Sequence, residues 1–304
     1  MRIFVTGSTG VIGRRAIPRL VAAGHQVTGV ARTPEKSGRV IEMGATPVQV
    51  DLFDPAAMRH AVAGHDAVIN LATSIPPSSR TFVLGAWREN DRIRRDASRY
   101  LAQAALAGGA DRLIQESFAP IYPDRGDAWI DESAPLQPAR YNRSVLDAEA
   151  AADRFTTSGH VGVVLRFAFF YGPDSDFTAD FIRFVRRGWA PTLGSPDGFV
   201  SSVSHDDAAA AVVAALGLPA GVYNVVDDEP LPRREFFGSL AATLGVAPPR
   251  FPPAWLARLT GSLGEMLARS QRISNRKLRD TSGWAPAIRS AKDGWPLVVP
   301  FMPR

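Results

Sequence analysis

The stretch RIFVTGSTGVIGRRAIPRLVAAG, residues 2–24, decides the fold. A short apolar run leads into three glycines spaced three residues apart, and apolar residues at helical spacing follow them. Glycines at such a strand-to-helix turn close the turn tightly, admit a pyrophosphate against the backbone and let the helix lie on the strand. Because the first N–H groups of the helix are unpaired, they attract negative phosphates. The stretch therefore predicts a dinucleotide-binding turn with these contact residues: Gly7, Thr9, Gly10, Val11, Ile12 and Gly13.

Short runs rich in β-branched residues alternate with longer helical segments from Arg2 to about Arg166. This alternation is typical of a parallel sheet with helices on both faces. After Arg166, proline and glycine become frequent and the periodic pieces become short, but one further strand-like run is expected to rejoin the sheet. The runs that predict strands are RIFVTG (2–7), QVTGVAR (26–32), TPVQVD (46–51), DAVINLA (66–72), DRLIQES (111–117), VGVVLRF (161–167) and GVYNVVD (221–227).

The predicted fold is a doubly wound parallel Rossmann sheet of about seven strands with a small, irregular C-terminal substrate domain. Residues 1–166 are assigned to the dinucleotide-binding domain, to which residues 205–228 return. Residues 167–204 and 229–304 are assigned to the substrate-binding part. Aromatic residues are frequent in the segments expected around the pocket and favour an apolar or aromatic small-molecule substrate, namely Trp87, Trp129, Phe167, Phe169, Phe170, Phe177 and Trp189.

Composition narrows the possible partners and chemistry. The chain has 35 Lys and Arg against 30 Asp and Glu, and its net charge of +5 favours anionic small molecules as readily as polymers. Its densest basic run, RENDRIRRDASR (88–99), contains three acidic residues and is interpreted as a solvated helix face, so no nucleic-acid partner is expected. The absence of cysteine excludes disulfides, thiolate metal sites and a cysteine nucleophile.

Targeting signals are not expected. The N-terminus begins with an apolar run and a glycine turn, without the basic region and long apolar segment of an export signal. No run approaches eighteen apolar residues, so no membrane span is expected. A cytoplasmic location is the prediction, which the lack of cysteine fits.

The end of the second predicted strand bears on the choice of cofactor. An acidic residue there accepts the adenosine ribose hydroxyl, whereas an arginine pairs with a 2′-phosphate. The strand runs into Arg32, and this favours NADP(H) over NAD(H). Glu35 follows three residues later, either as a ribose ligand in a folded-back loop or as a partner of Arg32.

Further motifs occur in a fixed order along nearly the whole chain: TGSTGVIG (6–13), VDL (50–52), NLA (70–72), YNRSVLDAE (141–149), LRFAFFYGP (165–173), SVSHDDAAAAVVAAL (202–216) and GVYNVVDDEPL (221–231). In these motifs the sequence resembles the extended short-chain dehydrogenases/reductases of the epimerase/dehydratase type. The resemblance implies that Asp51 and Leu52 flank the adenine. It also implies that Leu71, Ala72 and Thr73 line the cofactor near its phosphates and ribose, and that a homodimer is possible.

The resemblance further implies a Tyr-x-x-x-Lys pair on one helix. A tyrosine has a pKa near 10, so only about one in a thousand is ionised at pH 7 unless a cation lies nearby. Here Tyr141 matches the tyrosine, but Val145 stands where the lysine belongs. Arg140 and Arg143 are expected to point away from the helix face that Tyr141 and Val145 share.

The resemblance also implies a Ser or Thr at the end of the fifth strand. Ser117 is the candidate. Counting back from Tyr122, the aromatic residue after this strand, places Phe118 at the hydroxyl position and Ser117 one residue early. A one-residue shift in the loop would bring Ser117 to that position, so both assignments stay open.

Three functions remain open on these residues. The main prediction is an NADP(H)-binding oxidoreductase of a hydrophobic carbonyl or hydroxyl compound, in which neutral Tyr141 donates a proton. The second is a redox-silent isomerase, dehydratase or cyclase with a bound cofactor. The third is a non-catalytic protein that senses the cofactor.

One more group carries possible chemistry. His205 is followed by Asp206 and Asp207, but no G-x-S-x-G turn accompanies them to support a hydrolase. Adjacent carboxylates diverge on a helix, so no metal site is expected. The trio is interpreted as the start of a helix, with an aspartate near its N-cap.

Overall fold

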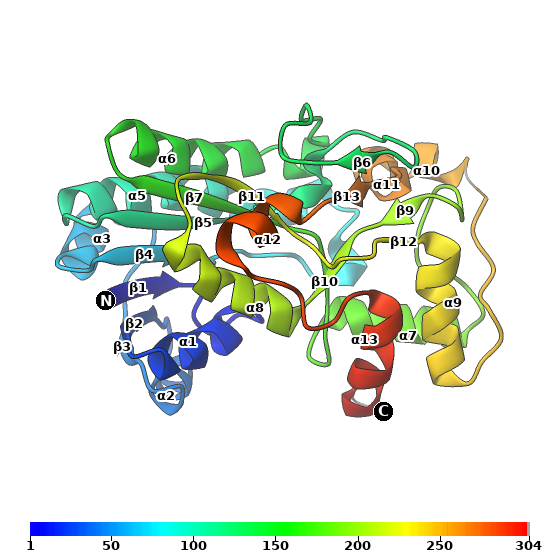
Figure 1. Ribbon diagram of the computed structural model, residues 1–304, viewed down its shortest axis with the longest axis horizontal. Coiled ribbons are helices and arrows are strands. Elements are labelled where there is room, and N and C mark those ends of the chain that lie inside the picture. The colour runs from blue at the N-terminus through cyan, green and yellow to red at the C-terminus, as the bar shows by residue number, and fades with distance from the viewer. Residues whose placement is uncertain (254, 303–304) are drawn as a thin grey trace.

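The computed structural model describes residues 1–253 and 255–302, and only the backbone at residue 258. Its centre is a parallel sheet in the order β11-β7-β5-β4-β1-β2-β3 (Figure 1). The strand order reverses between β1 and β4, which is where ligands bind in open sheets of this kind. The predicted doubly wound sheet is therefore confirmed. Its strands are β1 (Arg2–Thr6), β2 (Gln26–Val30), β3 (Thr46–Val48), β4 (Ala67–Asn70), β5 (Arg112–Phe118), β7 (Val161–Phe167) and β11 (Gly221–Val225).

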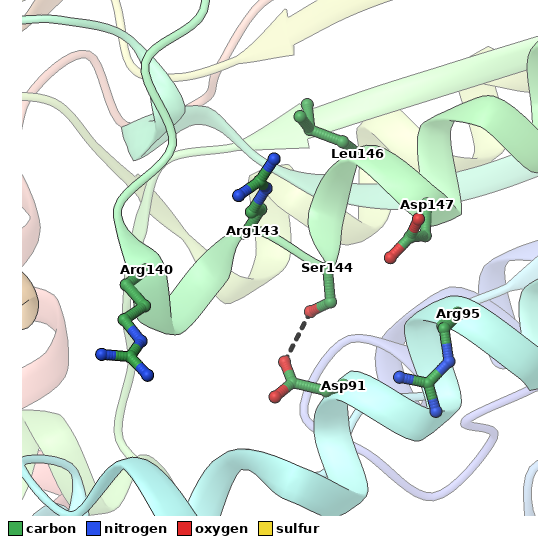
Figure 2. Close-up of a pocket in the computed structure, with 7 residues that line it drawn as sticks. All are labelled: Asp91, Arg95, Arg140, Arg143, Ser144, Leu146 and Asp147. Carbon is green, nitrogen blue, oxygen red and sulfur yellow. Dashed lines mark hydrogen bonds between the residues drawn. The ribbon is translucent and has the colours of Figure 1, made fainter.

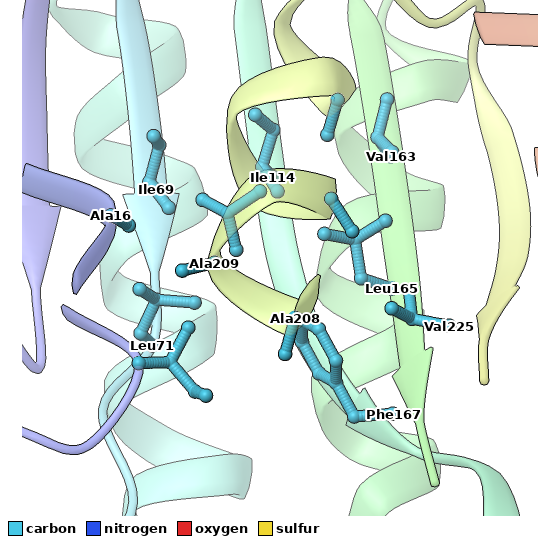
Figure 3. Close-up of a cluster of buried hydrophobic side chains, with 14 of the residues drawn as sticks. Ala16, Ile69, Leu71, Ile114, Val163, Leu165, Phe167, Ala208, Ala209 and Val225 are labelled. Carbon is cyan, nitrogen blue, oxygen red and sulfur yellow. The ribbon is translucent and has the colours of Figure 1, made fainter. Parts of the chain in front are cut away.

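Helices cover both faces of this sheet, as its strands require because they are apolar on both sides. In Figure 1, α3, α5 and α6 lie on one face and α1 and α8 on the other. Figure 3 shows the second face, where alanines of α8 pack on Ile114, Val163 and Leu165. The helices of this part are α1 (Gly13–Ala22), α2 (Pro34–Glu42), α3 (Pro55–Val62), α4 (Arg88–Arg92), α5 (Ser98–Ala107), α6 (Val145–Thr157) and α8 (His205–Ala214).

A second core lies beyond the carboxyl edge of the sheet, where α7, α9 and α13 pack together around Phe236, Phe237 and Trp295. Three small two-stranded sheets connect this part to the rest. Its elements are β6 (Trp129–Ile130), β8 (Phe169–Tyr171), α7 (Asp176–Arg186), β9 (Phe199–Val200), β10 (Ser202–Ser204), β12 (Leu231–Pro232), α9 (Arg233–Leu244), α10 (Leu256–Leu259), α11 (Gly261–Ala268), β13 (Arg272–Ile273), α12 (Arg276–Ser282) and α13 (Ala291–Val298).

Short turns complete the chain. A π-helical turn, η3 (Ile93–Ala97), interrupts the helix between α4 and α5. The 3-10 turns are η1 (Ser78–Arg80), η2 (Leu84–Trp87), η4 (Ala119–Ile121), η5 (Arg140–Asn142), η6 (Ala215–Gly217) and η7 (Val299–Phe301). In the part of the chain that the structure describes, no helix has the length and apolarity needed to cross a membrane.

Candidate active site

The glycine turn after β1 is shaped by two close approaches. Gly7 has a φ of +69°, and a Cβ there would lie 2.3 Å from the Leu71 carbonyl oxygen. A Cβ at Gly13 would lie 2.3 Å from the carbonyl oxygen of Gly7. Gly10 is exposed, and its N–H donates to the Gly7 carbonyl at 3.0 Å. The backbone at Gly10 is thus open to a ligand, while Gly7 and Gly13 allow the strand, turn and helix to close on one another.

The start of α1 has backbone N–H groups that no side chain accepts. No side chain caps this helix, whose N-cap position is Ile12. Unsatisfied N–H groups at a helix N-terminus bind anions. Thr9 and Val11 are half-buried beside this opening. A bare helix start behind a glycine turn fits the diphosphate of a dinucleotide.

The other predicted cofactor residues follow neighbouring strands along the same edge of the sheet. Leu71 and Ala72 are buried directly after β4, and the exposed Thr73 follows them. Asp51 and the half-buried Leu52 follow β3, and the Asp51 carboxylate accepts the Phe53 N–H at 2.9 Å. Because parallel strands end at one edge, these segments and the glycine turn lie along the same edge of the sheet.

Arg32 lies just after β2 with its side chain exposed. Within residues 1–253 and 255–302, it makes no hydrogen bond or ion pair through its side chain. Glu35 instead pairs with Arg39 one turn later in α2, at 2.7 Å between nitrogen and oxygen. The expected pairing of Glu35 with Arg32 is therefore wrong, because the helical i,i+4 partner is nearer, while its role as a ribose ligand stays a prediction.

Tyr141 lies in η5, four residues before the start of α6. Its side chain is buried, and its ring meets the Trp87 ring edge-on with 4.8 Å between centroids. Burial raises the pKa of Tyr141 far above its ordinary value, and the charges of Arg94 and Arg269 only partly oppose this rise. The phenol is thus neutral at pH 7. Val145, at the lysine position, is fully buried and uncharged.

The two arginines beside Tyr141 face elsewhere. Arg140 and Arg143 line a surface pocket between α4, η3 and the start of α6 (Figure 2). The same pocket is bordered by Asp91, whose carboxylate accepts the Ser144 hydroxyl at 2.7 Å. Neither arginine is among the charges that influence the pKa of the buried Tyr141 phenol.

Ser117 and Phe118 point to opposite faces at the end of β5. The Ser117 hydroxyl donates to the Glu149 carboxylate at 2.5 Å. Phe118 packs edge-on against Phe169, with 5.7 Å between centroids, and joins the apolar cluster that contains Tyr141. We therefore place Phe118 beside Tyr141 and assign Ser117 to the buried ion pair described next.

This ion pair joins Glu149 of α6 to Arg166 of β7 through two hydrogen bonds of 2.8 and 2.7 Å. Arg166 also donates to the Tyr122 hydroxyl at 2.7 Å, and that hydroxyl donates to Asn224 at 2.9 Å. Burial raises the pKa of Tyr122 to about 12, so it too stays neutral. Every charge here has a partner, as a buried network needs, and the network holds α6 and with it Tyr141 against the sheet.

The prediction that residues 88–99 form a solvated helix face is wrong in part. Asn90 and Arg94 are buried, and Arg94 pairs with Glu116 of β5 at 3.2 Å. Their signal was the helical spacing of Trp87, Asn90, Asp91 and Arg94, which puts all four on one face. Acidic neighbours at other positions of the helix, such as Glu89, hid that signal.

His205 is the first residue of α8, and its ring pairs with an aspartate from another part of the chain. Its Nδ1 lies 3.0 Å from an oxygen of Asp174, which also forms ion pairs with Arg14 and Arg15 of α1. The helix is capped by Ser204, whose hydroxyl accepts the Asp207 N–H at 3.0 Å, so an aspartate lies near the N-cap as expected. This charge cluster joins the start of α1 to the loop after β8.

Comparison with known proteins identifies the family. Residues 7–219 match the sequence model of a family described as NAD(P)H-binding. The chain is 33% identical to a 3-diazoavenalumate denitrifying reductase from a Streptomyces species, over 97% of this chain and 99% of the relative. It is 29% identical to a 4-hydroxy-2-methyl-3-oxo-4-farnesyl-3,4-dihydroquinoline-1-oxide ketoreductase from Stigmatella aurantiaca, over 89% of this chain and 81% of that one. It is 28% identical to a 2-alkyl-3-oxoalkanoate reductase from Shewanella oneidensis, over 90% and 73%.

Solved structures agree on the fold. A UDP-glucose 4-epimerase from Thermotoga maritima superposes with a TM-score of 0.80 over 99% of this chain and 98% of that one, at 20% identity. A UDP-glucose 4-epimerase from Thermus thermophilus in complex with NAD gives 0.79 over the same shares, at 24% identity. The chain therefore belongs to the NAD(P)H-binding family and is an NAD(P)-binding oxidoreductase with the epimerase/dehydratase fold of the extended short-chain dehydrogenases/reductases.

Proposed function

We propose that the protein is an NADP(H)-dependent oxidoreductase that reduces a hydrophobic, aromatic carbonyl compound to the alcohol. The observation that carries this proposal is the buried, neutral Tyr141 hydroxyl in an apolar cluster, at the sheet edge that also holds the glycine turn. The same site would oxidise the hydroxyl compound in the reverse direction.

The chemistry divides between the cofactor and the chain. The dinucleotide, when bound, supplies the hydride that reaches the carbonyl carbon. Tyr141 supplies the proton to the carbonyl oxygen, so that a C=O group becomes CH–OH. Because burial keeps its pKa raised, Tyr141 is protonated at pH 7, and reduction of a carbonyl is the direction that starts from this protonated form.

The substrate class follows from what surrounds Tyr141. Buried members of this cluster are Trp87, Ala139, Leu263 and Met266, and the partly buried Phe118, Phe169 and Leu267 pack against them. Flat aromatic and aliphatic walls with one proton donor suit an apolar ligand with one polar group. The reductases from Stigmatella aurantiaca and Shewanella oneidensis have names that give keto substrates with alkyl or farnesyl groups, in agreement with this class.

The preference for NADP(H) rests on Arg32. Its exposed, uncommitted guanidinium follows β2, the position from which an arginine pairs with a 2′-phosphate. Lys36 lies in the first turn of α2, where its backbone N–H donates to the Thr33 hydroxyl at 3.3 Å. Glu35, the one acid near this position, is occupied by Arg39.

A second candidate substrate is an aryl diazonium compound. The site lacks the family's lysine, and its Ser117 hydroxyl is bound to Glu149, so a reaction that needs no proton donor also suits it. Hydride addition to the terminal nitrogen of a diazonium cation needs no proton donor, and loss of N₂ then leaves an aromatic C–H bond. The Streptomyces relative, whose name gives a diazo compound, favours this candidate.

The test is consumption of NADPH by the purified protein with a panel of aryl ketones, aliphatic ketones and an aryl diazonium salt. We expect turnover with an aromatic substrate and a loss of at least tenfold in kcat for ketones in the Tyr141→Phe variant. Diazonium reduction that survives this substitution selects the second candidate. Binding of NADPH without oxidation by any member of the panel would overturn both and favour redox-silent chemistry.

A further inference from the structure

One face of the helix formed by η2, α4 and η3 is turned toward Tyr141. Trp87, Asp91 and Arg94 occur at helical spacing and share this face. Trp87 contacts the Tyr141 ring, and Asp91 accepts the Ser144 hydroxyl (Figure 2). Two contacts, one turn apart, thus fix this face against residues 141–144.

Arg94 lies on the same face, one turn further along. Its side chain is only 4% exposed, and its Nη2 donates to the Glu116 Oε1 at 3.2 Å. Glu116 precedes Phe118 by two residues in β5, so both side chains leave the strand on one face. Phe118 packs against the cluster that contains Tyr141. The ion pair therefore lies two residues along β5 from the apolar cluster that contains Tyr141.

A π-helical turn coincides with this placement. It spans Ile93–Ala97 and widens the helix where Arg94 enters the interior. Single π-helical turns inside α-helices occur frequently at functional sites. The adjacent Arg95 points outward and pairs with Asp96 at 3.0 Å. Neighbouring arginines thus have opposite environments on one turn of helix.

The Arg94–Glu116 pair is not optimised for stability. Arg94 Nε and Glu116 Oε2 are buried and have no hydrogen-bond partner among the residues that the structure describes. A buried ion pair with atoms left unpaired loses more on desolvation than its attraction returns. The nearby Glu149–Arg166 pair, by contrast, uses both carboxylate oxygens. The unpaired atoms of Arg94 and Glu116 are explained better by a role of this pair in the site than by a contribution to stability.

The charged groups that face the Tyr141 phenol come from two elements outside its own turn. Arg94 comes from η3, with Glu116 behind it, and Arg269 follows α11. Arg269 is committed to the carbonyl oxygens of Tyr122 and Gln137, at 3.0 and 2.6 Å. Both cations favour the ionised phenol over the neutral one, against the larger effect of burial on its pKa.

We propose that Arg94, held by Glu116, is the positioning residue that gives Tyr141 the positive charge missing at Val145. The inference rests on the proposed role of Tyr141 as proton donor. When the phenol gives up its proton, the guanidinium stabilises the phenolate that forms, as a lysine at position 145 would do from the neighbouring turn.

The test uses the full-length protein with 3,5-difluorotyrosine at position 141, whose phenol titrates in an accessible pH range and is followed by ¹⁹F NMR. We expect Arg94→Met to raise the pKa of this phenol by about one unit, a tenfold change in its ionisation constant. Glu116→Gln should lower it, because the carboxylate that offsets the Arg94 charge is removed. Arg95→Met, one residue away, is the matched control and should leave it unchanged.

An equal pKa in Arg94→Met and in the parent protein would overturn the proposal. If Arg94→Met fails to fold because Glu116 is left unpaired, the Arg94→Met/Glu116→Gln double variant is compared with Glu116→Gln alone, and the same rise in pKa is expected between these two. The titration needs no substrate, so it is independent of the proposed reaction. A shifted pKa with an unshifted pH profile of ketone reduction would refute the role of Tyr141 while retaining the effect of Arg94 on its ionisation.

Discussion

The Trp87 ring meets the Tyr141 ring at 64° between planes, and this contact joins the helix that carries Arg94 to the turn that carries Tyr141. Trp87 also donates its indole N–H to the Thr81 carbonyl at 2.8 Å, so its orientation is fixed from both ends. Tyr141 is thereby enclosed by apolar side chains with charge only behind them. The arrangement suits a reductase whose acid stays protonated until the substrate takes the proton.

Val145→Lys is expected to be harmful alone. It places a cation without a carboxylate partner at a fully buried position, and we expect it to lower the free energy of unfolding by about 3 kcal/mol. The double variant Arg94→Met/Val145→Lys moves the charge to the family's usual position and should recover most of that loss. Urea unfolding of both variants checks this. Equal stability of the two would show that the side chains at 94 and 145 do not share one site.

Ser117→Ala tests whether this hydroxyl takes part in the reaction. Glu149 keeps both hydrogen bonds from Arg166, so the free energy of unfolding should fall by only about 1 kcal/mol, with kcat within twofold of the parent protein. Steady-state kinetics and urea unfolding measure both quantities. A fall in kcat of a hundredfold at unchanged stability would return Ser117 to the catalytic site.

Glu149→Gln is predicted to be far more damaging than Ser117→Ala. It leaves Arg166 as a buried cation without a charged partner, and breaking such a pair costs about 3–5 kcal/mol. The surface pair of Glu35 and Arg39 provides the control, since Glu35→Gln should change stability by less than about 0.5 kcal/mol. Similar effects of the two substitutions would mean that the network does not anchor α6.

Acid stability should depend on Asp174. Although burial opposes it, the hydrogen bond from His205 and the ion pairs with Arg15 and Arg14 hold the pKa of Asp174 well below its ordinary value. A carboxylate with a lowered folded pKa stabilises the fold above its unfolded pKa of about 3.9, and this contribution is lost as pH falls below it. Asp174→Asn should thus lower the Tm at pH 7, and the gap from the parent protein should narrow below about pH 4. A gap that is constant with pH would contradict the linkage.

His205 also makes the protein less stable as pH falls, and its effect begins at a higher pH than that of Asp174. Burial lowers the pKa of His205 despite its hydrogen bond to Asp174, so the folded protein resists its protonation. Stability from this effect is present above the unfolded pKa of about 6.5 and declines as pH falls below it. His205→Gln should remove the part of the Tm decrease that begins near this pH, as scanning calorimetry between neutral and mildly acid pH would show.

The fold followed from the sequence because its signals are local. The run before Gly7 is apolar on both faces, and the glycines at 7 and 13 stand where a Cβ would strike the backbone. Such positions tolerate few alternatives, so the glycine turn and the order of the strands were predictable. Arg32 could be placed at the end of a strand for the same reason.

The site was less predictable because it depends on contacts distant in sequence. The helical spacing of Trp87, Asn90, Asp91 and Arg94 marks one face of the helix, but it does not show that Arg94 on this face meets Glu116 of β5. The choice between Ser117 and Phe118 depends on which face of β5 meets Tyr141, and a one-residue shift reverses that choice. The i,i+4 spacing of Glu35 and Arg39 predicts that they pair. The position of Glu35 after the second strand equally suggested a ribose ligand, so the sequence did not decide between the two.

Cofactor binding at the glycine turn is tested by Gly10→Ala. The added methyl group would lie 3.2 Å from the Gly7 carbonyl oxygen, on the exposed side where the diphosphate is expected. We expect at least tenfold weaker NADPH binding with little change in Tm. Gly38→Ala is the control, because nothing lies within 4 Å of a Cβ there and a helical alanine is favourable. Unchanged NADPH affinity in Gly10→Ala would move the diphosphate away from this turn.

The most direct measurement is isothermal titration of the purified protein with NADPH, NADP, NADH and NAD, beside the Arg32→Glu variant. The account predicts tight binding of NADPH and NADP, weak binding of NADH and NAD, and loss of the preference in the variant because the 2′-phosphate loses its cation and meets a carboxylate. Equal affinity for NADPH and NADH in the parent protein, or no effect of Arg32→Glu, would contradict it.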